Sequence, residues 1–391
     1  MTARIINADV LDGLRPLADG SVHCVVTSPP YWGLRDYGTA QWEGGNAACD
    51  HKQGRASTSH ADGVIDPEHG RARDSVAGSN RCSKCGARRI DAQIGLEATP
   101  EEYVAKMVAV FREVRRVLRA DGTAWLNLGS SFSQYLKPKD MVPIPWMVAM
   151  ALQKDGWYLR SDIIWSKPNP MPESVTDRPT KAHEYVFLLA KSARYYYDAE
   201  GIKEPASVGD HARNIDCRYM APGQSEHTGL RKGGLSRGPV PENDHRDKMT
   251  EKEQCSGMRN KRSVWTIAAQ AFPGAHFATF PEKLVEPCIL AGTSARGCCP
   301  KCGAGWERTT EPKSMATSSI WRPGCKCDAG DPVPATVLDP FFGSGTVGLV
   351  AAKVGRSFIG IDLSAAYCEM ARKRIVDACG LLVRGLNVES R

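Results

Sequence analysis

The sequence predicts a doubly wound α/β fold with a mostly parallel, Rossmann-like sheet, and three observations lead to it. Both ends of the chain alternate short strand patterns with helical patterns. Residues 22–27, VHCVVT, are continuously apolar and rich in β-branched side chains, as in strands buried on both faces of a parallel sheet. Residues 335–355 read as a strand, a glycine-rich turn and a helix, the pattern of a nucleotide-binding unit.

The individual elements follow from apolar periodicity and from capping signals. Thr99 is placed to cap a helix, with Pro100 at its first position and two glutamates behind it. In the first half, we expect strands at 4–8, 22–27, 121–129 and 157–167, helices at 11–17, 99–118 and 143–156, and a β-hairpin made by 184–192 and 193–198. In the second half, we expect helices at 280–292, 347–355 and 364–375 and strands at 335–340 and 357–362.

Composition narrows the class of protein. With 391 residues, 42% hydrophobic and 24% charged, the chain has the profile of a globular protein, which excludes wholesale disorder and a membrane bundle. The N-terminus lacks the features of a signal peptide, and stretches such as VAMAL are too short to cross a bilayer. We therefore expect a cytoplasmic protein without a membrane partner. In that reducing compartment, 14 cysteines indicate metal binding more than disulfides, and the net charge of +7 permits a polyanionic partner.

The unit near the carboxyl end predicts a nucleoside-binding site. A strand ends at Asp339, Gly343 and Gly345 form the turn, and a helix begins near Thr346. Glycines let backbone N–H groups approach a ligand, and Asp362, which ends the next strand, can accept hydrogen bonds from ribose hydroxyls. The loop lacks a full G-x-G-x-x-G pattern and the lysine of a P-loop, which disfavours a dinucleotide or a nucleoside triphosphate.

A second motif ends the predicted strand at 22–27. Ser28-Pro29-Pro30-Tyr31 stops this strand, because proline fixes φ and has no N–H for the ladder. A hydroxyl and an aromatic ring are thereby placed at the carboxyl end of a central strand, where ligands bind in open α/β sheets.

Together these two motifs resemble those of the amino-methylating DNA methyltransferases. Residues 339–346, DPFFGSGT, resemble that family's S-adenosylmethionine motif, and residues 27–32, TSPPYW, resemble its catalytic motif. The catalytic motif comes first, as in the permuted, beta-type group of the family. Residues 276–281, HFATFP, are similar to the segment that packs on the methionine part of the cofactor.

The resemblance implies a role for each matching residue. The implied catalytic residues are Ser28, Pro29, Pro30 and Tyr31. The implied cofactor-binding residues are Asp9, Phe280, Asp339, Pro340, Phe341, Gly343, Ser344, Gly345, Thr346 and Asp362. Asp9 is similar to the acidic residue that meets the cofactor's adenine, although it could equally cap the helix at 11–17.

The implied chemistry suits these residue types. The Ser28 hydroxyl and the Pro29 carbonyl can accept hydrogen bonds from an exocyclic ring amine, freeing its lone pair to attack the sulfonium methyl in line, while Tyr31 would stack on the base. Serine at the first motif position goes mainly with cytosine N4 in the family, so we expect a DNA (cytosine-N4) methyltransferase. The alternatives are an adenine-N6 methylase and a catalytically inactive, zinc-containing DNA-binding module. A carbon-5 mechanism through Cys288 is disfavoured, because Pro287-Cys288 lies inside a predicted helix.

Cysteine spacing predicts two structural zinc sites. Cys299-x-x-Cys302 followed by Cys325-x-Cys327 supplies four thiolates in two close pairs, with Cys298 as a substitute ligand. Cys49-x-His51 with Cys82-x-x-Cys85 is the second candidate, in which His60 or His69 could replace the nitrogen ligand. Four protein ligands would close both sites to water.

We expect duplex DNA as the partner, and the family resemblance is also compatible with a cognate restriction endonuclease. Basic residues of the target-recognition insertion could follow phosphates, namely Arg213, Arg218, Arg231, Lys232, Arg237, Arg259, Lys261 and Arg262. Residues 165–170 could border the flipped base, although Trp165 itself suits the core. The expected parts are a catalytic half (1–43 and 86–198), a zinc-binding loop (44–85), a target-recognition insertion (199–262), a cofactor half (263–296 and 329–391) and a zinc ribbon (297–328).

Overall fold

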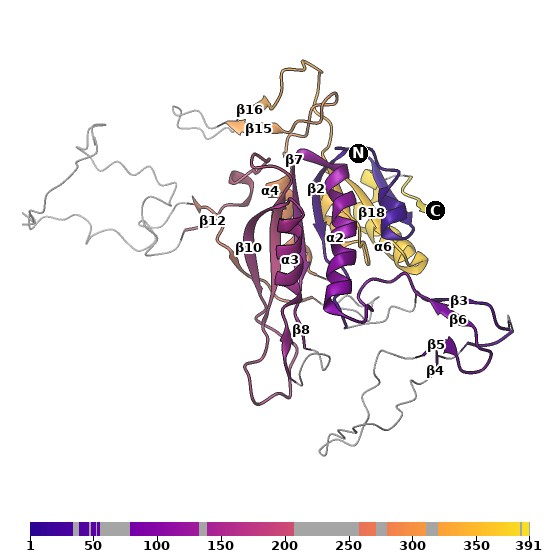
Figure 1. Ribbon diagram of the computed structural model, residues 1–391. Helices are drawn as coiled ribbons and strands as arrows, with labels where there is room; N and C mark the ends of the chain where they lie inside the picture. Colours follow the sequence, from indigo (N-terminus) through magenta and orange to yellow (C-terminus); the bar gives the residue numbers. More distant parts are fainter. Residues whose placement is uncertain are drawn as a thin grey trace, which may run out of the picture. The chain divides into compact units, whose positions relative to one another are not determined.

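The computed structural model describes most of the chain (Figure 1). The described residues are 1–33, 39–46, 48–51, 53–54, 79–132, 139–206, 258–270, 280–309, 320–383 and 385–390. They divide into two units, the first made of 1–198 with 263–391 and the second of 199–262.

A nine-stranded sheet forms the centre of the first unit, counted over the described residues. Its order is β14 (Val264–Thr266), β10 (Tyr158–Ser166), β11 (His183–Ala190), β7 (Leu118–Leu128), β2 (Val22–Thr27), β17 (Thr336–Asp339), β18 (Ser357–Asp362), β1 (Ala3–Asn7) and β19 (Val388–Ser390). All neighbours from β7 to β19 pair in parallel, whereas β11 is antiparallel to β7 and to β10. The predicted doubly wound, mostly parallel fold is therefore confirmed.

Helices cover both faces of this sheet (Figure 1). One group, which packs together beside β7, β10 and β18, contains α1 (Val10–Leu14), α2 (Pro100–Val117) and α3 (Ile144–Lys154). The other group contains α4 (Glu282–Gly292), α5 (Thr346–Lys353) and α6 (Ala365–Cys379), followed by a short 3-10 turn, Gly380–Val383. With helices on both sides, the central strands are buried on both faces, which explains why β2 is apolar apart from His23 at its start and Thr27 at its end.

Local signals set the bounds of the longest helix. The Thr99 hydroxyl accepts a hydrogen bond from the Glu102 backbone N–H at 3.2 Å, and Pro100 occupies the first turn, as predicted. Tyr103, Met107 and Phe111 are fully buried at helical spacing against the sheet. This stripe packs α2 against β7, and the Tyr103 hydroxyl donates to the Pro30 carbonyl of the Ser-Pro-Pro-Tyr motif at 3.0 Å.

The predicted hairpin between 184–192 and 193–198 is wrong. Strand β11 already pairs with β10 along one edge and with β7 along the other, so neither edge is left for residues 193–198. That segment forms no strand and turns back over the sheet, where the Tyr196 N–H donates to the Asp121 carbonyl at 2.8 Å.

The first unit also contains smaller sheets outside the nine-stranded sheet. They are β3 (Gln41–Glu43), β6 (Arg88–Ile90), β5 (Ser79–Cys82) and β4 (Gln53–Gly54) in one sheet, β8 (Ser131–Phe132) with β9 (Met141–Val142), and β15 (Trp306–Thr309) with β16 (Ile320–Pro323). The first of these follows the Ser-Pro-Pro-Tyr motif, and the last lies within the predicted zinc ribbon.

The second unit is described at its two ends only. After the 3-10 turn Glu200–Ile202, β12 (Glu204–Pro205) pairs antiparallel with β13 (Met258–Arg259). Arg259 and Arg262 each donate to Glu204 at 3.0 Å. These two predicted phosphate contacts therefore share an acidic partner, and the predicted contacts Arg213, Arg218, Arg231, Lys232 and Arg237 lie outside the described residues.

In the described parts of the chain, every helix is too short or too polar to span a bilayer.

Candidate active site and cysteine clusters

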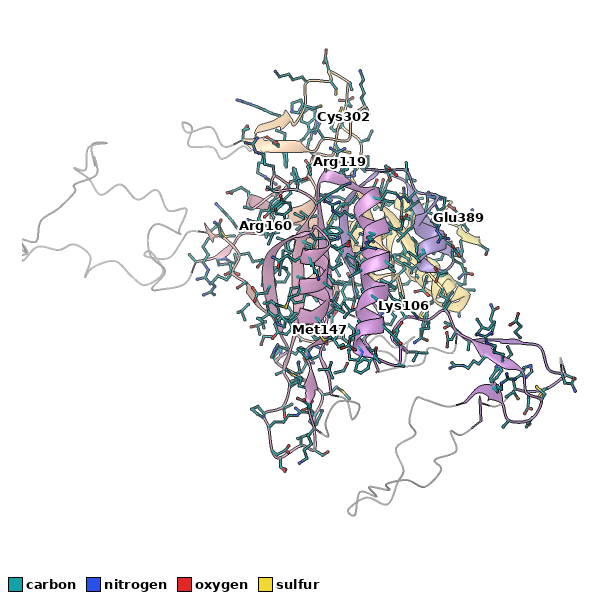
Figure 2. The ribbon with its side chains drawn as sticks, viewed as in Figure 1. Lys106, Arg119, Met147, Arg160, Cys302 and Glu389 are labelled. Carbon is teal, nitrogen blue, oxygen red and sulfur yellow. The ribbon has the colours of Figure 1, made fainter. Side chains whose placement is uncertain are left out.

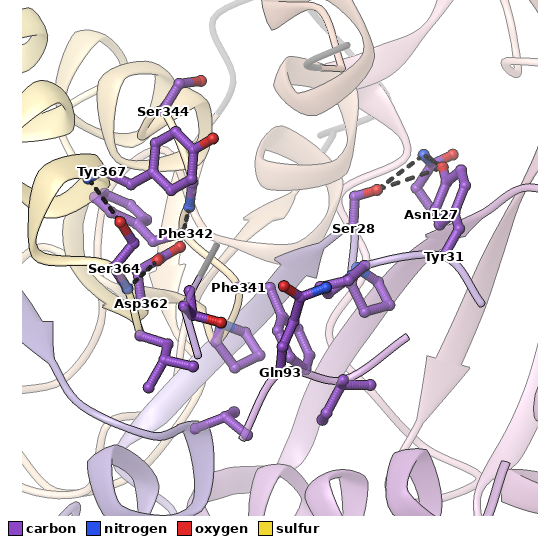
Figure 3. A pocket seen from close by; sticks show the side chains of 18 of the residues that line it. Ser28, Tyr31, Gln93, Asn127, Phe341, Phe342, Ser344, Asp362, Ser364 and Tyr367 are labelled. Carbon is purple, nitrogen blue, oxygen red and sulfur yellow. Dashed lines mark hydrogen bonds between the residues drawn. The ribbon is translucent and has the colours of Figure 1, made fainter. Parts of the chain in front are cut away.

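The two motifs meet in one pocket because their strands are neighbours in the sheet. Strand β2 ends at Thr27 and β17 ends at Asp339, and the Thr27 hydroxyl donates to Asp339 Oδ1 at 2.7 Å. The adjoining cavity, of about 280 Å³, is lined by residues of both halves (Figure 3). Its lining includes Ala8, Asp9, Val10, Ser28, Pro29, Pro30, Tyr31, Gln93, Asn127, Trp165, Glu184, Phe280, Pro340, Phe341, Gly343, Ser344, Thr346 and Asp362.

Ser28 and Tyr31 belong to one hydrogen-bond network (Figure 3). The Ser28 hydroxyl donates to the Tyr31 hydroxyl at 3.4 Å, and the Asn127 amide donates to Ser28 at 3.3 Å and to Tyr31 at 2.7 Å. The Tyr31 hydroxyl in turn donates to Glu184 Oε2 at 2.7 Å. A continuous chain of hydrogen bonds thus links Ser28 to a carboxylate.

The Glu184 carboxylate is held by three partners. Besides Tyr31, it accepts from the Asn127 amide at 3.0 Å, and Lys167 donates to its other oxygen. Burial, and then the charge of Glu184, raise the pKa of Tyr31 well above its usual value. Tyr31 therefore stays protonated and acts as a donor to Glu184 at neutral pH.

The surroundings of this network fix the position of the aromatic ring. A Cβ added to Gly129 would lie 2.7 Å from the Tyr31 ring, so the ring rests on the backbone at the end of β7. Trp165 lines the pocket but is only 3% exposed, and its indole N–H donates to the Ile267 carbonyl at 2.8 Å. The expectation that Trp165 belongs to the core agrees with this burial, and the Lys167 ammonium lies 4.3 Å from the centre of its ring.

The glycine loop opens the other half of the pocket. Gly343 has a φ of +48°, and no described atom lies within 4 Å of a Cβ built there, so its backbone faces open pocket space. Gly345 has a φ of +76° and serves a different purpose, because a Cβ there would lie 2.7 Å from that of Ala371 on α6. Of the two glycines, Gly343 lines the pocket and Gly345 brings α5 and α6 together.

Acidic side chains border this half of the pocket. Asp362 accepts from the Gly343 N–H at 2.7 Å and from the Ser364 N–H at 2.8 Å, and burial raises the pKa of its carboxyl. Asp9 caps α1 through the Leu11 N–H at 2.9 Å and also lines the pocket. Both roles considered for Asp9 are therefore sterically compatible.

Asp339 lies behind the loop instead of in the pocket lining. Its Oδ1 accepts from Thr27 and from the Phe341 N–H at 3.1 Å, and in the described part of the chain its Oδ2 is buried without a hydrogen-bond partner. Burial raises the pKa of Asp339 to about 7. The remaining predicted residues Phe280, Pro340, Phe341, Ser344 and Thr346 line the pocket, and residues 276–279 lie outside the described residues.

Comparison with known proteins identifies the family. Residues 22–373 match the profile of the N6 and N4 methyltransferases, described as DNA methylase. The chain belongs to this family of DNA methylases. The methylase is 33% identical over 398 residues to the type II methyltransferase M.Cfr9I of Citrobacter freundii, covering 95% of this chain and 87% of that protein. It is 34% identical over 400 residues to the type II methyltransferase M.SmaI of Serratia marcescens, covering 96% and 91%.

A solved structure supports the fold of the methylase. The PvuII DNA methyltransferase, described as cytosine-N4-specific, superposes with a TM-score of 0.52 at 14% sequence identity, covering 100% of this chain and 95% of that one. The methylase therefore shares the sheet architecture of that enzyme.

Asn127, Glu184 and Gln93 line the pocket, but sequence reasoning missed them. Asn127 is a polar residue in the otherwise apolar run 124–128 at the end of β7, and Glu184 is a charged residue near the start of β11. A polar side chain in a buried strand needs hydrogen-bond partners, so the two polar residues themselves were the sequence signal of a polar site. Gln93 stands in a stretch without apolar periodicity, and only the fold places it in the pocket wall (Figure 3).

Two cysteine clusters form within the described residues of the methylase. One is Cys49, His51, Cys82 and Cys85, and the other is Cys299, Cys302, Cys325 and Cys327; in each, all ligand atoms lie within 4.8 Å of one another. Both sets agree in membership with the predicted zinc ligands. His60 and His69 lie outside the described residues, and Cys298 lies outside the second cluster, with its Sγ 3.3 Å from the Val333 carbonyl.

The second cluster is anchored to the amino edge of the sheet (Figure 2). Arg119 is the second residue of β7 and donates to the Cys302 carbonyl. His23 is the second residue of β2, and its Nε2 lies 3.0 Å from the Gly303 carbonyl. His23 Nδ1 accepts from the Thr336 N–H at 3.0 Å, so Nε2 is the donor. Burial and the nearby Arg119 charge lower the pKa of His23 to about 4, which keeps this ring neutral.

Cys288 does not meet the pocket. It is 1% exposed on α4, and its thiol donates to the Leu284 carbonyl. A buried helical cysteine outside the pocket lining has no access to a base, which agrees with the decision against a carbon-5 mechanism.

Proposed function

We propose that this methylase transfers a methyl group from S-adenosylmethionine to the exocyclic N4 amine of a cytosine flipped out of duplex DNA. The observation that carries the proposal is the juxtaposition of Ser28 with the glycine loop in one pocket. A hydroxyl that can accept from an amine stands beside a site suited to a nucleoside, which is what amine methylation needs.

The pocket fits the proposed cofactor. A side chain at position 343 would fill the open space over Gly343, so glycine leaves that space for a ligand. Two backbone N–H groups orient the Asp362 carboxylate, and its other lone pairs are available for ribose hydroxyls. Asp9, Phe280 and Phe341 supply an acceptor and apolar walls. When bound, the cofactor supplies an electrophilic methyl group.

The protein's own groups would prepare the target amine. Ser28 Oγ and the Pro29 carbonyl would accept its two N–H groups, so that the nitrogen lone pair leaves conjugation with the ring. The attacking nitrogen becomes positively charged as it takes the methyl group, and the Glu184 carboxylate, linked to Ser28 through Tyr31, would lower the energy of that charge. After methyl transfer the cationic nitrogen would give a proton to Ser28 Oγ, while Ser28 passes its own proton to Tyr31 and Tyr31 passes its own to Glu184.

The choice of cytosine N4 rests on serine at position 28, which goes mainly with that amine in the family. We also propose that the methylase is of type II, like its relatives M.Cfr9I and M.SmaI, with a cognate restriction endonuclease. Residues 199–262 form a separate compact unit, which supports their proposed role in target recognition.

Nucleoside analysis tests the proposed reaction. The purified protein is incubated with labelled S-adenosylmethionine and genomic DNA, and the DNA is digested to nucleosides for mass spectrometry. We expect N4-methyldeoxycytidine. Detection of N6-methyldeoxyadenosine would show that the target is adenine N6 and not cytosine N4. If the protein binds both cofactor and DNA but transfers no methyl group, the proposed enzyme is instead a DNA-binding module.

We also propose that each cysteine cluster holds one structural zinc ion. The donor sets fit, since they are one imidazole with three thiols and four thiols at mutual distances suited to one tetrahedral ion. Hydrogen bonds from the backbone N–H groups of Cys302 and Lys301 lower the pKa of Cys299 to about 7, which favours the thiolate that a metal requires.

Metal analysis of the purified chain should find about two zinc ions per molecule. The double variant Cys82→Ser/Cys85→Ser should retain about one, and so should Cys299→Ser/Cys302→Ser, because each removes half of one ligand set. If the wild type holds one ion, the proposed site whose double variant still holds one ion is contradicted. If the wild type holds none, both proposed sites are contradicted.

A further inference from the structure

Two loops border the pocket at the carboxyl edge of the sheet. One spans residues 167–182 between β10 and β11, and Trp165 before it and Glu184 after it both line the pocket. The other contains β8 and β9 and follows directly after β7. Figure 1 shows β8 at the end of the sheet opposite β15 and β16. We call residues 139–142 and 167–182 together the rim.

Ion pairs connect the two parts of the rim and stabilise the longer loop. The Lys139 ammonium lies 2.7 Å from the Asp177 carboxylate, which joins one loop to the other. Within residues 167–182, the Arg178 guanidinium lies 2.6 Å from the Glu173 carboxylate. These four charged side chains therefore have partners of opposite charge on the rim itself.

Lys181 differs from the other two lysines of the rim. Lys139 and Lys167 each contact a carboxylate, whereas the Lys181 ammonium has, within the described residues, only the Met141 thioether as an acceptor, at 3.9 Å. A thioether is a weak acceptor, and an ammonium carries three N–H donors. The side chain is half-buried, and burial lowers the pKa of Lys181. Such a position is unfavourable for an ammonium unless a ligand supplies stronger acceptors.

The carboxylates near Lys181 already have cationic partners. The negative charges of Glu184 and Glu173 both act on Lys181, but neither carboxylate is hydrogen-bonded to it. Glu184 accepts a hydrogen bond from Lys167, and Glu173 accepts one from Arg178. A strong acceptor for Lys181 would therefore come from outside the rim.

The sheet order places Lys181 on the side of the pocket proposed for the base. Lys181 comes two residues before β11, and β7 and β2 separate β11 from β17, which carries the glycine loop. At about 3.3 Å per extended residue, its Cα lies within roughly 10 Å of that of Glu184. The Glu184 carboxylate ends the hydrogen-bond chain from Ser28. An anion at Lys181 would thus arrive with the target nucleotide and not with the cofactor.

The anion that accompanies a nucleotide in DNA is its backbone phosphate. A DNA methylase acts on DNA, in which every internal nucleotide has a phosphate on each side. The three donors of a lysine ammonium can bind phosphate oxygens as a compact point charge.

We propose that Lys181 binds a backbone phosphate that flanks the flipped nucleotide and so holds the DNA strand against the rim while the base occupies the pocket. The inference rests on the proposed function, because it takes the base to be flipped toward Ser28. It assigns a DNA contact to the catalytic half of the chain, separate from the role proposed for residues 199–262.

Lys154 provides a matched control. It is an exposed lysine at the end of α3, and in the described parts of the chain it too has no carboxylate partner. Strand β10 begins four residues later at Tyr158, and its other end, Ser166, leads into the rim. Lys154 therefore lies at the amino edge of the sheet, so Lys154→Met and Lys181→Met remove the same charge from opposite edges.

Binding to chemically modified DNA tests the proposed contact. The wild-type protein first methylates genomic DNA, and the methylated positions are mapped by sequencing. The probe is a short fluorescent duplex that contains a mapped site. In two further duplexes, one or the other phosphate that flanks the target nucleotide is replaced by a neutral methylphosphonate. The affinity of each full-length protein for each duplex is measured between about 50 and 200 mM salt.

Lys181→Met should lower the affinity for the unmodified duplex by about tenfold and reduce the slope of log affinity against log salt by about 1. The wild type should lose as much affinity on one of the two methylphosphonate duplexes. On that duplex Lys181→Met should cost nothing further, because the contact is already absent. Lys154→Met should match the wild type throughout. Lys181→Arg keeps the positive charge and should retain most of the affinity, which separates loss of charge from loss of fold.

Four outcomes would overturn the proposal. Lys181→Met could match the wild type in affinity and salt dependence, Lys154→Met could show an equal loss, Lys181→Arg could lose as much as Lys181→Met, or the losses from Lys181→Met and from each methylphosphonate could add. In all four cases the wild type still methylates DNA, so the proposed function stands. Absence of transfer by the wild type would instead contradict the proposed function, and with it the flipped nucleotide on which this contact depends.

Discussion

Alanine in place of Ser28 should lower the rate of methyl transfer by about 100-fold or more, while the affinity for S-adenosylmethionine stays unchanged. The hydroxyl is the proposed acceptor for the target amine, and loss of one positioned hydrogen bond to a developing charge costs about 10²–10³ in rate. Cofactor affinity should persist because the glycine loop and Asp362 keep their contacts with each other.

Single-turnover transfer of a labelled methyl group measures the rate in Ser28→Ala, and calorimetry measures cofactor affinity. Ser21→Ala is the control, because Ser21 precedes the same strand at its far end and its hydroxyl donates to the nearby Ala18 carbonyl. The proposed role of Ser28 is contradicted if Ser28→Ala transfers at the wild-type rate or if it loses cofactor binding.

Glutamine in place of Glu184 should reduce the rate of methyl transfer by about 100-fold, with little change in the Michaelis constant for DNA. The substitution keeps the shape of the side chain but removes the negative charge at the end of the Ser28–Tyr31 hydrogen-bond chain. It also leaves the Lys167 ammonium beside the pocket without its carboxylate, which disfavours positive charge on the amine.

A double-mutant cycle distinguishes this role from a structural one. If Tyr31 connects Ser28 to Glu184, then Tyr31→Phe combined with Glu184→Gln should cost little more than the larger single effect. Glu173→Gln is the matched control, because Glu173 forms a half-buried pair with Arg178 at 2.6 Å outside the pocket lining. Additive losses in the cycle, or an equal loss in Glu173→Gln, would contradict the proposed connection.

The sheet and the motif-bearing strands could be predicted because their signals are local. Strand β2 is mostly apolar and is ended by Pro29. The Thr99 cap, followed by Pro100 and two glutamates, marks the start of α2. Cysteine spacing likewise predicted the members of both clusters, although residues 52–81 separate the two halves of the first. In that cluster, pairing of Gln53 with Cys82 brings the halves together.

Non-local pairing limited the prediction of the rest. Glu184 reaches the pocket because β11 runs antiparallel to β7, with Tyr185 opposite Leu128 and Val186 opposite Asn127. Sequence reasoning paired residues 184–192 with the following segment, so it missed this register and, with it, the partners of Tyr31. Side chains supplied by strands distant in sequence carry no local signal of their common site.

The hydrogen bond between Thr27 and Asp339 has a consequence for how such enzymes could be engineered. It ties the end of one motif strand to the end of the other inside the sheet, so the spacing between amine acceptor and cofactor loop is independent of the long segments that separate them in the chain. Residues 44–85 and residues 199–262 both lie between these two strands in the chain, outside the strand pair itself. If residues 199–262 carry the proposed target recognition, exchanging them between related methylases should transplant sequence preference while the chemistry of the recipient is preserved.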